Sequence, residues 1–270
     1  LLEDKSVKKI GQNIKFDFIV LYKQGIKMSS MEDTMLMSYV LDAGKNRHNM
    51  DTLSEIHLSH KTISFKDLVG TGKKEINFSD VELDRAMEYA AEDADITYRL
   101  YKIFNKNLKL EKLTNIYEIF EKPLIKILAF MEIEGIKIDN KFLKVLSEKF
   151  EKKIRSLEKK IFTISKKEFN IGSPKQLGEI IYNELKIAKL KKTRKGSFAT
   201  SANVLEDLAF KGHEFPKLIL DWRQVSKLKN TYSDSLPEHI NPNTKRVHTS
   251  FLLAATNTGR LASSDPNLQN

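Results

Sequence analysis

The chain has 270 residues, with 46 lysines and arginines against 36 acidic residues and no cysteine. The lack of cysteine excludes disulfides, thiolate zinc sites and a thiol nucleophile. No run of 18 apolar residues could cross a membrane, and the first residues do not form a signal peptide, so we expect a cytoplasmic protein. The chain begins at Leu1 rather than Met and stops at Asn270 without a polar tail, which indicates part of a longer protein.

The positive charge is confined to the second part of the chain. Residues 1–110 contain 17 basic and 17 acidic residues, and residues 111–270 contribute the whole net charge of +10. A neutral part with embedded carboxylates, joined to a basic part, indicates that one part holds a polyanion on which the other part acts.

Short elements are predicted for the first 80 residues from their apolar patterns and turn residues. They are a strand at 7–13, a helix from near Asp17 closed by Gly25, a helix at 34–41 after Asp33, a helix capped by Asp51, and a polar loop at 61–78.

A long helix is predicted from a capping box at residues 79–82 to about Leu108, because no proline or glycine interrupts it. Tyr89 and Asp93 lie four residues apart and therefore share a helix face. A phenol beside a carboxylate suits a site for a metal ion and a water molecule. The alternative interpretation is the solvated side of an ordinary helix.

Two apolar seams follow a helix predicted at 116–134, which Pro123 is expected to bend. The first seam is Leu146, Phe150, Ile154, Leu157, Ile161 and Ile164, and the second is Leu218, Trp222, Val225, Lys229, Tyr232 and Leu236. Their spacing predicts two helices that pack antiparallel. The other faces of the first helix are basic, since residues 141–170 hold ten Lys/Arg against four Glu.

Between and after the seams, three further features are predicted. Ser173 is expected to cap a helix whose first residue is Pro174. Residues 186–195 contain six basic residues and no acid, and could clamp a phosphate backbone or form a solvated charge run. Residues 246–251 are expected to form a strand.

Without a cysteine or another obvious nucleophile, hydrolysis of a phosphodiester requires metal ions held by carboxylates from distant parts of the sequence. Asp17, which follows residues 11–16, and Asp93 are the candidate ligands. No H-E-x-x-H motif exists, and His57 with His60 is interpreted as a surface pair rather than a ligand pair.

Four segments together resemble the bacterial DNA polymerases of family A. Residues 11–17 (GQNIKFD) look like the second motif of the family's 3′→5′ exonuclease domain, and residues 89–93 (YAAED) look like the third. Residues 173–177 (SPKQL) resemble the start of the thumb's tip, and residues 258–270 (TGRLASSDPNLQN) match the motif that leads into the palm. The four segments occur in order and cover essentially the whole chain.

The resemblance implies an α/β, ribonuclease H-like exonuclease domain at residues 1–110 that lacks its first strands. It implies the N-terminal part of a polymerase domain at 111–270, with a mainly α-helical thumb at about 136–237 and the beginning of the palm at 238–270. By motif, Asp17 and Asp93 would bind Mg²⁺, or Mn²⁺ or Zn²⁺ in its place, and Tyr89 would orient the attacking water. The implied DNA contacts are Asn13 at the single-strand pocket, Arg223 and Lys227 on the second thumb helix, and Arg260, Asn267 and Gln269 near the primer end.

By the same resemblance, the first exonuclease motif lies upstream of Leu1 and the polymerase carboxylates lie downstream of Asn270. We therefore expect the intact enzyme to carry out template-directed DNA synthesis with 3′→5′ proofreading, and this chain alone to bind DNA with little or no activity. The implied partners are primer–template DNA, single-stranded 3′ ends and, for the intact enzyme, dNTPs. We expect a monomer associated with the nucleoid.

Two alternatives remain open. A stand-alone 3′→5′ exonuclease of the ribonuclease D or Werner type shares the second and third motifs but does not account for residues 258–270 or the paired lysine-rich helices. A non-catalytic basic module that only binds nucleic acid is the other.

Overall fold

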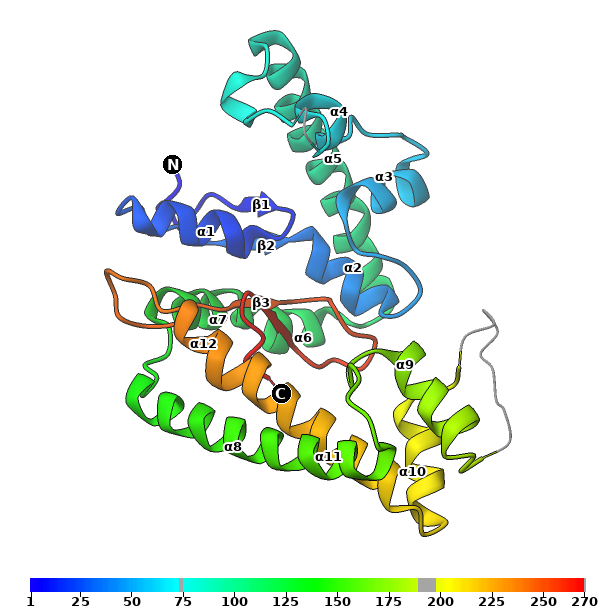
Figure 1. Cartoon of the computed structure of the whole chain (residues 1–270). Coiled ribbons are helices and arrows are strands. Elements are labelled where there is room, and N and C mark those ends of the chain that lie inside the picture. The colour runs from blue at the N-terminus through cyan, green and yellow to red at the C-terminus, as the bar shows by residue number, and fades with distance from the viewer. Residues whose placement is uncertain (73–74, 189–197, 270) are drawn as a thin grey trace. The chain divides into compact units, whose positions relative to one another are not determined.

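The computed structural model describes residues 1–72, 75–188 and 198–269. The chain forms two compact units, one made of Leu1–Ile136 with His248–Asn270 and the other of Lys137–Val247 (Figure 1). Helices dominate both units, and the sheets are small. None of the helices in the described ranges is long and apolar enough to cross a membrane.

The first unit begins with a β–α–β arrangement. Strands β1 (Lys9–Gly11) and β2 (Met31–Asp33) pair in parallel, and α1 (Ile14–Lys23) connects them (Figure 1). The strand predicted at 7–13 is therefore confirmed. The predicted start of the helix near Asp17 is wrong by about one turn, because α1 starts at Ile14. Its N-terminal N–H groups are satisfied by Asp33, a residue too distant in sequence for a local capping pattern to reveal.

Two more short helices follow, α2 (Thr34–Asp42) and α3 (Met50–Leu58). The helix predicted after Asp33 is confirmed, since the Asp33 side chain accepts hydrogen bonds from the first N–H groups of α2. The predicted cap by Asp51 is wrong. Asn49 occupies the N-cap position of α3, and Asp51 instead accepts a hydrogen bond from the Thr62 hydroxyl at 2.7 Å.

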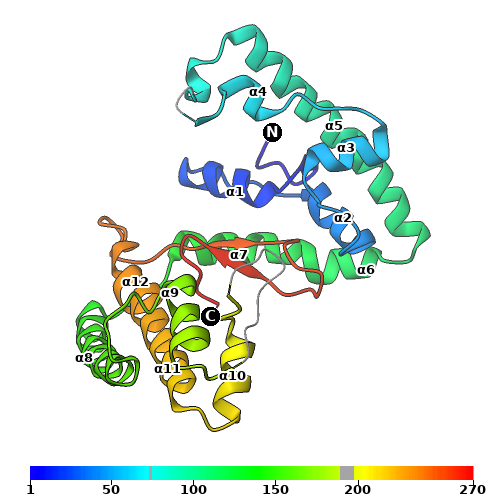
Figure 2. The same ribbon diagram turned by 45° about the vertical axis from the view of Figure 1, so that its right-hand side comes forward.

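The segment predicted as a loop at 61–78 contains the short helix α4 (Phe65–Val69) and leads into a 3₁₀ turn, Phe78–Asp80. The predicted capping box is also wrong, because Ser79 lies within that turn and α5 (Leu83–Leu110) starts later, without a side-chain cap. The remainder of α5 follows the prediction. Helix α5 runs along α2 and α3 (Figure 2). Its buried apolar residues are Ile96, Leu100, Phe104 and Leu108.

The first unit is completed by a helical segment and a hairpin. Helix α6 (Thr114–Ile116) passes through a π-helical turn, Tyr117–Glu121, into α7 (Lys122–Glu134), which has Pro123 in its first turn and ends at Gly135 with a φ of 68°. The helix predicted at 116–134 is thus confirmed, and the bend expected at Pro123 stays a prediction. The strand predicted at 246–251 is shifted, because β3 (Ser250–Leu252) pairs antiparallel with β4 (Ala262–Ser264), whereas Val247 forms an isolated bridge with Ile240.

The second unit is helical. Its helices are α8 (Asn140–Ser165), α9 (Pro174–Glu179), α10 (Ala202–Phe210), α11 (Glu214–Leu228) and α12 (Ser235–Glu238), with π-helical turns at Ile180–Glu184 and Lys229–Asp234. The predicted cap of α9 is confirmed, since the Ser173 side chain accepts a hydrogen bond from the Gln176 N–H.

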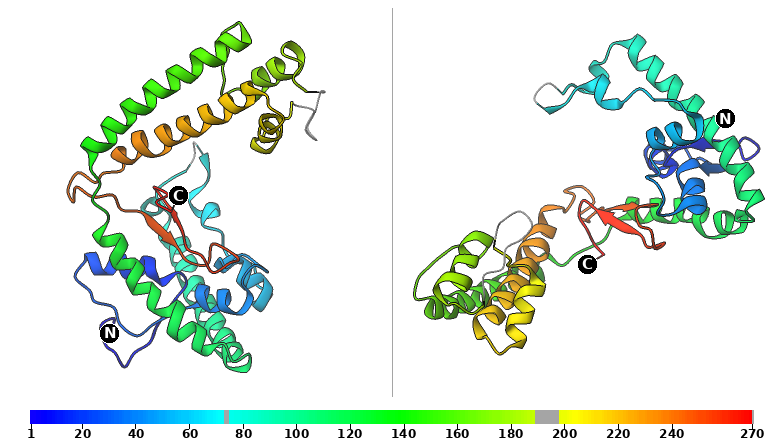
Figure 3. Two further views of the ribbon diagram at one scale, coloured as in Figure 1. Left: turned by 90° about the horizontal axis from the view of Figure 1, so that it is seen from below. Right: turned by 90° about the vertical axis from the view of Figure 1, so that its right-hand side faces the viewer.

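The two predicted seams pack against each other in antiparallel register (Figure 3). Three contacts define this register. Ser147 donates to Asp234 at 2.6 Å, Glu151 pairs with Lys229 at 3.5 Å, and the Trp222 indole donates to Glu158 at 3.1 Å. Burial of the seam residues supplies the hydrophobic stabilisation that holds α8 on α11.

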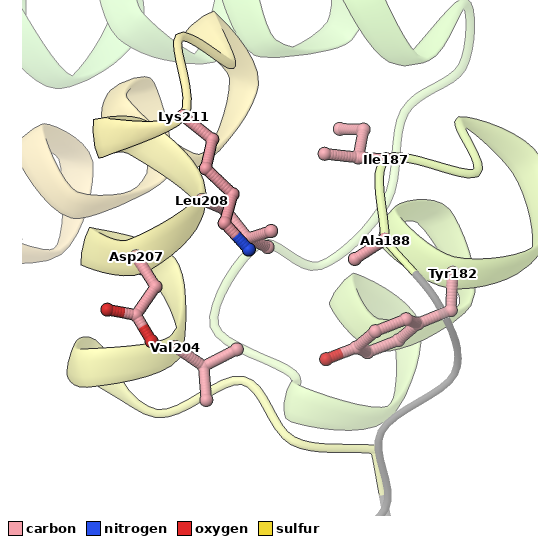
Figure 4. A pocket seen from close by; sticks show the side chains of 7 residues that line it. All are labelled: Tyr182, Ile187, Ala188, Val204, Asp207, Leu208 and Lys211. Atoms are coloured by element: carbon pink, nitrogen blue, oxygen red, sulfur yellow. The ribbon is translucent and has the colours of Figure 1, made fainter.

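A cavity of about 320 Å³ lies at the end of this unit near α10. Val204, Asp207, Leu208 and Lys211 line one side, and Tyr182, Ile187 and Ala188 line the other (Figure 4). Ile187 and Ala188 belong to the 186–195 run that could clamp a phosphate backbone, whereas the other lining residues are not among those predicted to bind DNA or a metal ion.

Candidate functional site

The predicted residues Asn13 and Asp17 lie at the start of α1. Asn13 adopts a left-handed backbone conformation, with φ 57°, which asparagine tolerates better than most residues. Its side chain and that of Asp17 are both exposed. Partial burial nevertheless raises the pKa of Asp17 above its ordinary value.

A fully buried carboxylate, Asp33, fixes the position of this helix start. Its Oδ1 accepts hydrogen bonds from the N–H groups of Asn13 at 3.1 Å and Met35 at 2.9 Å, and its Oδ2 accepts one from Ile14 at 3.0 Å. Leu36 adds a longer bond at 3.4 Å. One side chain therefore caps both α1 and α2. Burial raises the pKa of Asp33 to about 6, and the N–H donors oppose that rise.

Tyr89 and Asp93 meet on one face of α5, as their spacing predicts. The Tyr89 side chain hydrogen-bonds Asp93, and burial together with the Asp93 charge raises the pKa of Tyr89 to about 12. The phenol therefore stays protonated at neutral pH and can act as a donor. Burial raises the pKa of Asp93, and the hydrogen bond from Tyr89 opposes that rise. The Asp93 Oδ1 atom is buried without a hydrogen-bond partner.

The ring of Tyr89 is held by two aromatic residues from outside α5. Its centroid lies 6.1 Å from that of Phe65 and 6.2 Å from that of Phe78, and these two rings stack on each other at 5.8 Å. Phe65 and Phe78 are 48% and 42% exposed, which gives this face of the unit an aromatic surface beside Asp93. The sequence prediction missed both residues, because they lie in the segment read as a polar loop.

Glu92 clamps a loop onto α5 next to Asp93. Its Oε1 hydrogen-bonds Nε2 of His60 at 2.7 Å, and its Oε2 accepts the N–H of Ile63 at 2.7 Å. The interpretation of His57 and His60 as a surface pair is wrong for His57, whereas the His60 side chain is 42% exposed. His60 is bound to Glu92, while the His57 ring packs edge-on against Phe104 and its Nε2 is buried.

Besides burial, the charges of Glu92 and Asp51 raise the pKa of Asp93, and Tyr89 lowers it. Burial raises the pKa of Asp17, and its own backbone lowers it. Within the ranges described, no group of three or more His, Cys, Asp or Glu side chains is arranged to hold a metal ion. The unpartnered Oδ1 of Asp93 suits a cation ligand, but a complete ligand set is not present in those ranges. These residues do not by themselves fit a metal ion, and we derive no reaction step through one.

Of the two basic residues predicted on α11, Arg223 is half-buried and Lys227 is exposed. The Arg223 Nη1 donates to the Thr200 carbonyl at 2.7 Å, and burial lowers the pKa of the guanidinium. Arg223 therefore helps to hold the segment before α10 in place, while Lys227 extends into solvent. The basic run at 186–195 lies outside the described residues beyond position 188.

The predicted residues near the C-terminus lie on either side of β4. Arg260 is exposed, and its carbonyl accepts a hydrogen bond from the Thr256 hydroxyl at 2.7 Å. Asn267 and Gln269 lie together, because the Gln269 N–H donates to the Asn267 Oδ1 at 2.9 Å. The Asn267 side chain thus shapes its own turn, while the side chains of Arg260 and Gln269 face solvent.

Comparison with known proteins finds two family matches along the chain. The family model described as 3'-5' exonuclease matches residues 1–109, and that of DNA polymerase family A matches residues 140–270. DNA polymerase I of Rhizobium leguminosarum is 51% identical over all of this chain and 27% of its own length. DNA polymerase I of Pseudomonas aeruginosa is 43% identical over all of this chain and 30% of its own length.

Among solved structures, the POL domain of Pol1 from M. smegmatis, in complex with DNA primer-template and dNTP, is similar with a TM-score of 0.82 and 28% identity. The match covers 100% of this chain and 44% of that one. The chain spans less than a third of the length of the two curated relatives described above.

Proposed function

Because this chain belongs to the family A DNA polymerases of bacteria, we propose that it contributes DNA-holding helices and part of a proofreading site to an enzyme of template-directed DNA synthesis. The longer enzyme would extend a primer 3′ end with dNTPs and remove mispaired 3′ ends in replication and repair. We propose the cytoplasm, at the nucleoid, as its location and a monomer as its state.

The helix pair α8–α11 is the observation that carries the DNA-binding part of the proposal. Its apolar seam faces inward, and all eight Lys/Arg of α8 are exposed; they are Lys141, Lys144, Lys149, Lys152, Lys153, Arg155, Lys159 and Lys160. Two of the three acids of α8 are engaged with Lys229, Arg155 and Trp222. A helix pair with a row of exposed cations suits the phosphate backbone of a duplex and gives little sequence preference.

Titration of the 270-residue chain with a labelled primer–template duplex at several salt concentrations tests this proposal. Affinity should fall steeply with salt, and Lys227→Ala should reduce the slope of log K against log salt by about 0.9, the value for one phosphate contact. Lys109→Ala, on α5 and exposed, is the matched control and should leave the slope unchanged.

Arg223 needs a separate design, because Arg223→Ala also removes its bond to Thr200. Arg223→Lys keeps the charge, and we expect it to preserve most of the salt slope while lowering the melting temperature. An unchanged slope in the double variant Arg223→Ala/Lys227→Ala would remove both residues from the proposed DNA contact. Asn13, Asn267 and Gln269 stay proposed DNA contacts, and Arg260 stays a proposed contact of the primer end.

For the proofreading part, we propose Asp17 and Asp93 as ligands of a divalent cation, Mg²⁺ or in its place Mn²⁺ or Zn²⁺, within the longer enzyme, with Tyr89 as a positioned donor. The half-exposed rings of Phe65 and Phe78, which pack against Tyr89, suit stacking of single-stranded bases. We expect the chain alone to bind Mn²⁺ weakly in a paramagnetic titration, and Asp93→Asn to weaken that binding further. Equal Mn²⁺ affinity of the wild type and Asp93→Asn would contradict the assignment of Asp93.

A further inference from the structure

A continuous set of contacts in the first unit connects the turn before α1 to the turn that precedes β4. The Gln12 Nε2 donates to the His48 carbonyl at 2.7 Å. The His48 ring lies edge-on to the Tyr39 ring, with centroids 5.5 Å apart and planes at 86°. The Tyr39 hydroxyl donates to the Thr256 carbonyl at 2.7 Å. Residues 217 positions apart in sequence are thereby joined by one buried tyrosine.

Tyr39 is well suited to hold this turn, because it is only 7% exposed and its hydroxyl is satisfied by the Thr256 carbonyl. A buried tyrosine hydroxyl requires a hydrogen-bond partner, so the bond fixes both the ring and the carbonyl. The turn is closed on its other side by the Thr256 hydroxyl, which donates to the Arg260 carbonyl at 2.7 Å. Thr256 is therefore bound at once to α2 and to Arg260.

Two further contacts help to fix the position of this turn. Gly44, after the end of α2, has a φ of +81°, and a Cβ at this position would lie 3.1 Å from the Asn257 Cγ. A Cβ here would force the Asn257 side chain to shift by a few tenths of an ångström, and the positive φ of Gly44 independently favours glycine. On the other side of Tyr39, the buried His48 ring is fixed by a hydrogen bond of 2.9 Å between its Nδ1 and the Ser38 hydroxyl.

We propose that Tyr39 is a positioning residue that holds the 254–260 turn, and with it Arg260, and that His48 couples this turn to Gln12, with its ring on Tyr39 and its carbonyl on Gln12. The part concerning DNA rests on the proposed function, because it takes Arg260 as a DNA contact. The part concerning the turn depends only on the contacts above. The two sequence segments joined in this way, 11–17 and 258–270, are those that match different activities of the family.

Amide hydrogen exchange across residues 250–264 tests the structural part. Tyr39→Phe keeps the ring and removes only the donor to Thr256, so exchange there should accelerate about 2- to 12-fold, the range for one lost hydrogen bond. Tyr182→Phe removes a bond of the same kind, to the Ala199 carbonyl at 2.8 Å in the second unit, and should leave 250–264 unchanged. Exchange that is equal in Tyr39→Phe and the wild type would overturn the proposal.

His48→Ala tests the coupling. Loss of the ring, with its contacts to Tyr39 and Ser38, should loosen the chain at residue 48, whose carbonyl holds Gln12, so exchange should accelerate at 250–264 and around residues 11–14. Adding Tyr39→Phe should then have less effect at 250–264 than Tyr39→Phe has alone. Acceleration restricted to residues 11–14 in His48→Ala would overturn the coupling.

Affinity for a primer–template duplex separates this proposal from the proposed function. If Arg260→Ala and Tyr39→Phe each weaken binding and the double variant is no weaker than Arg260→Ala, Tyr39 acts through Arg260, as proposed. If Arg260→Ala weakens binding while Tyr39→Phe changes neither binding nor exchange, the positioning role of Tyr39 fails and the proposed function stands. If Arg260→Ala has no effect on binding while Tyr39→Phe accelerates exchange, Arg260 is not a DNA contact, but Tyr39 still holds the turn.

Discussion

The Oδ2 atom of Asp33 accepts a hydrogen bond from the backbone N–H of Ile14 at 3.0 Å, although the two residues are 19 positions apart. The same carboxylate caps α2, so the starts of two helices depend on one side chain. Since α1 carries Asn13 at its N-cap and Asp17 in its first turn, the geometry of these proposed site residues is set from β2.

Replacement of Asp33 should therefore lower the free energy of unfolding by more than the loss of an ordinary helix cap does. Asp33→Asn offers one acceptor oxygen to the N–H donors of two helices and should lower the free energy of unfolding by about 2–3 kcal/mol. Asp139→Asn is the matched control, because Asp139 is an exposed cap of α8 with a single bond to Phe142 N–H and asparagine caps equally well. Denaturant unfolding measures both, and equal changes would contradict the double-cap role.

The same carboxylate predicts a pH dependence. The pKa of Asp33 is about 6 in the folded state against 3.8 as its reference value, so the folded state binds a proton first as the pH falls. Protonation of Asp33 therefore stabilises the fold progressively from about pH 7 to about pH 4, and this stability is lost again as the pH rises through 6. The wild type should gain about 3 kcal/mol over Asp33→Asn across that interval, since one pKa unit corresponds to about 1.4 kcal/mol. A stability difference that is constant with pH would contradict this.

Sequence patterns predicted the elements whose stability is local. The seam of α8, the cap at Ser173 and the pairing of Tyr89 with Asp93 depend on residues three to four positions apart, and all three are confirmed. The patterns failed where residues distant in sequence determine where a helix starts. Ser79 lies in a 3₁₀ turn that ends before α5 starts, and the start of α1 is capped from another strand by Asp33.

The roles of Glu92 and Phe65 could not be read from the sequence for a related reason. A glutamate beside an aspartate on a helix resembles any solvated face, and its contacts with His60 and Ile63 arise only once the 59–64 loop folds back. Phe65 lay in a segment too short and polar to predict a helix, so its packing against Tyr89 became visible only in three dimensions.

The Glu92 clamp leads to a further prediction. Glu92→Gln replaces one of two acceptor oxygens with a donor, so the Ile63 N–H or His60 loses its partner. Amide exchange over residues 59–64 should accelerate about 10- to 150-fold, the effect of one lost hydrogen bond to a charged group. Asp95→Asn on the same helix, where Asp95 makes only an exposed contact with Arg99 at 3.4 Å, should leave that loop unchanged. Equal rates in both variants would show that Glu92 does not hold the loop.

Packing of the α8–α11 pair leads to another prediction. Ile161 is fully buried in the seam, so Ile161→Ala should destabilise the chain by about 2–5 kcal/mol through lost burial and the cavity left behind. Val145→Ala, at a position of α8 that is 50% exposed, should change stability by less than about 0.5 kcal/mol. Thermal unfolding followed by circular dichroism distinguishes the two, and a small loss for Ile161→Ala would mean that α8 does not pack on α11 through this seam.

The Tyr89–Asp93 pair leads to the last prediction. Burial is the largest cause of the raised pKa of Tyr89, and the negative charge of Asp93 is the next. Asp93→Asn removes that charge, so the pKa of Tyr89 should fall from about 12 toward its ordinary value of 10 without reaching it, because the burial by Phe65 and Phe78 persists. Asp95→Asn, two residues further along α5, serves as the control. Tyrosine ring ¹³Cζ resonances followed against pH report the ionisation directly. An unchanged pKa in Asp93→Asn would mean that burial alone raises it and that the Tyr89 phenol does not interact with the Asp93 carboxylate.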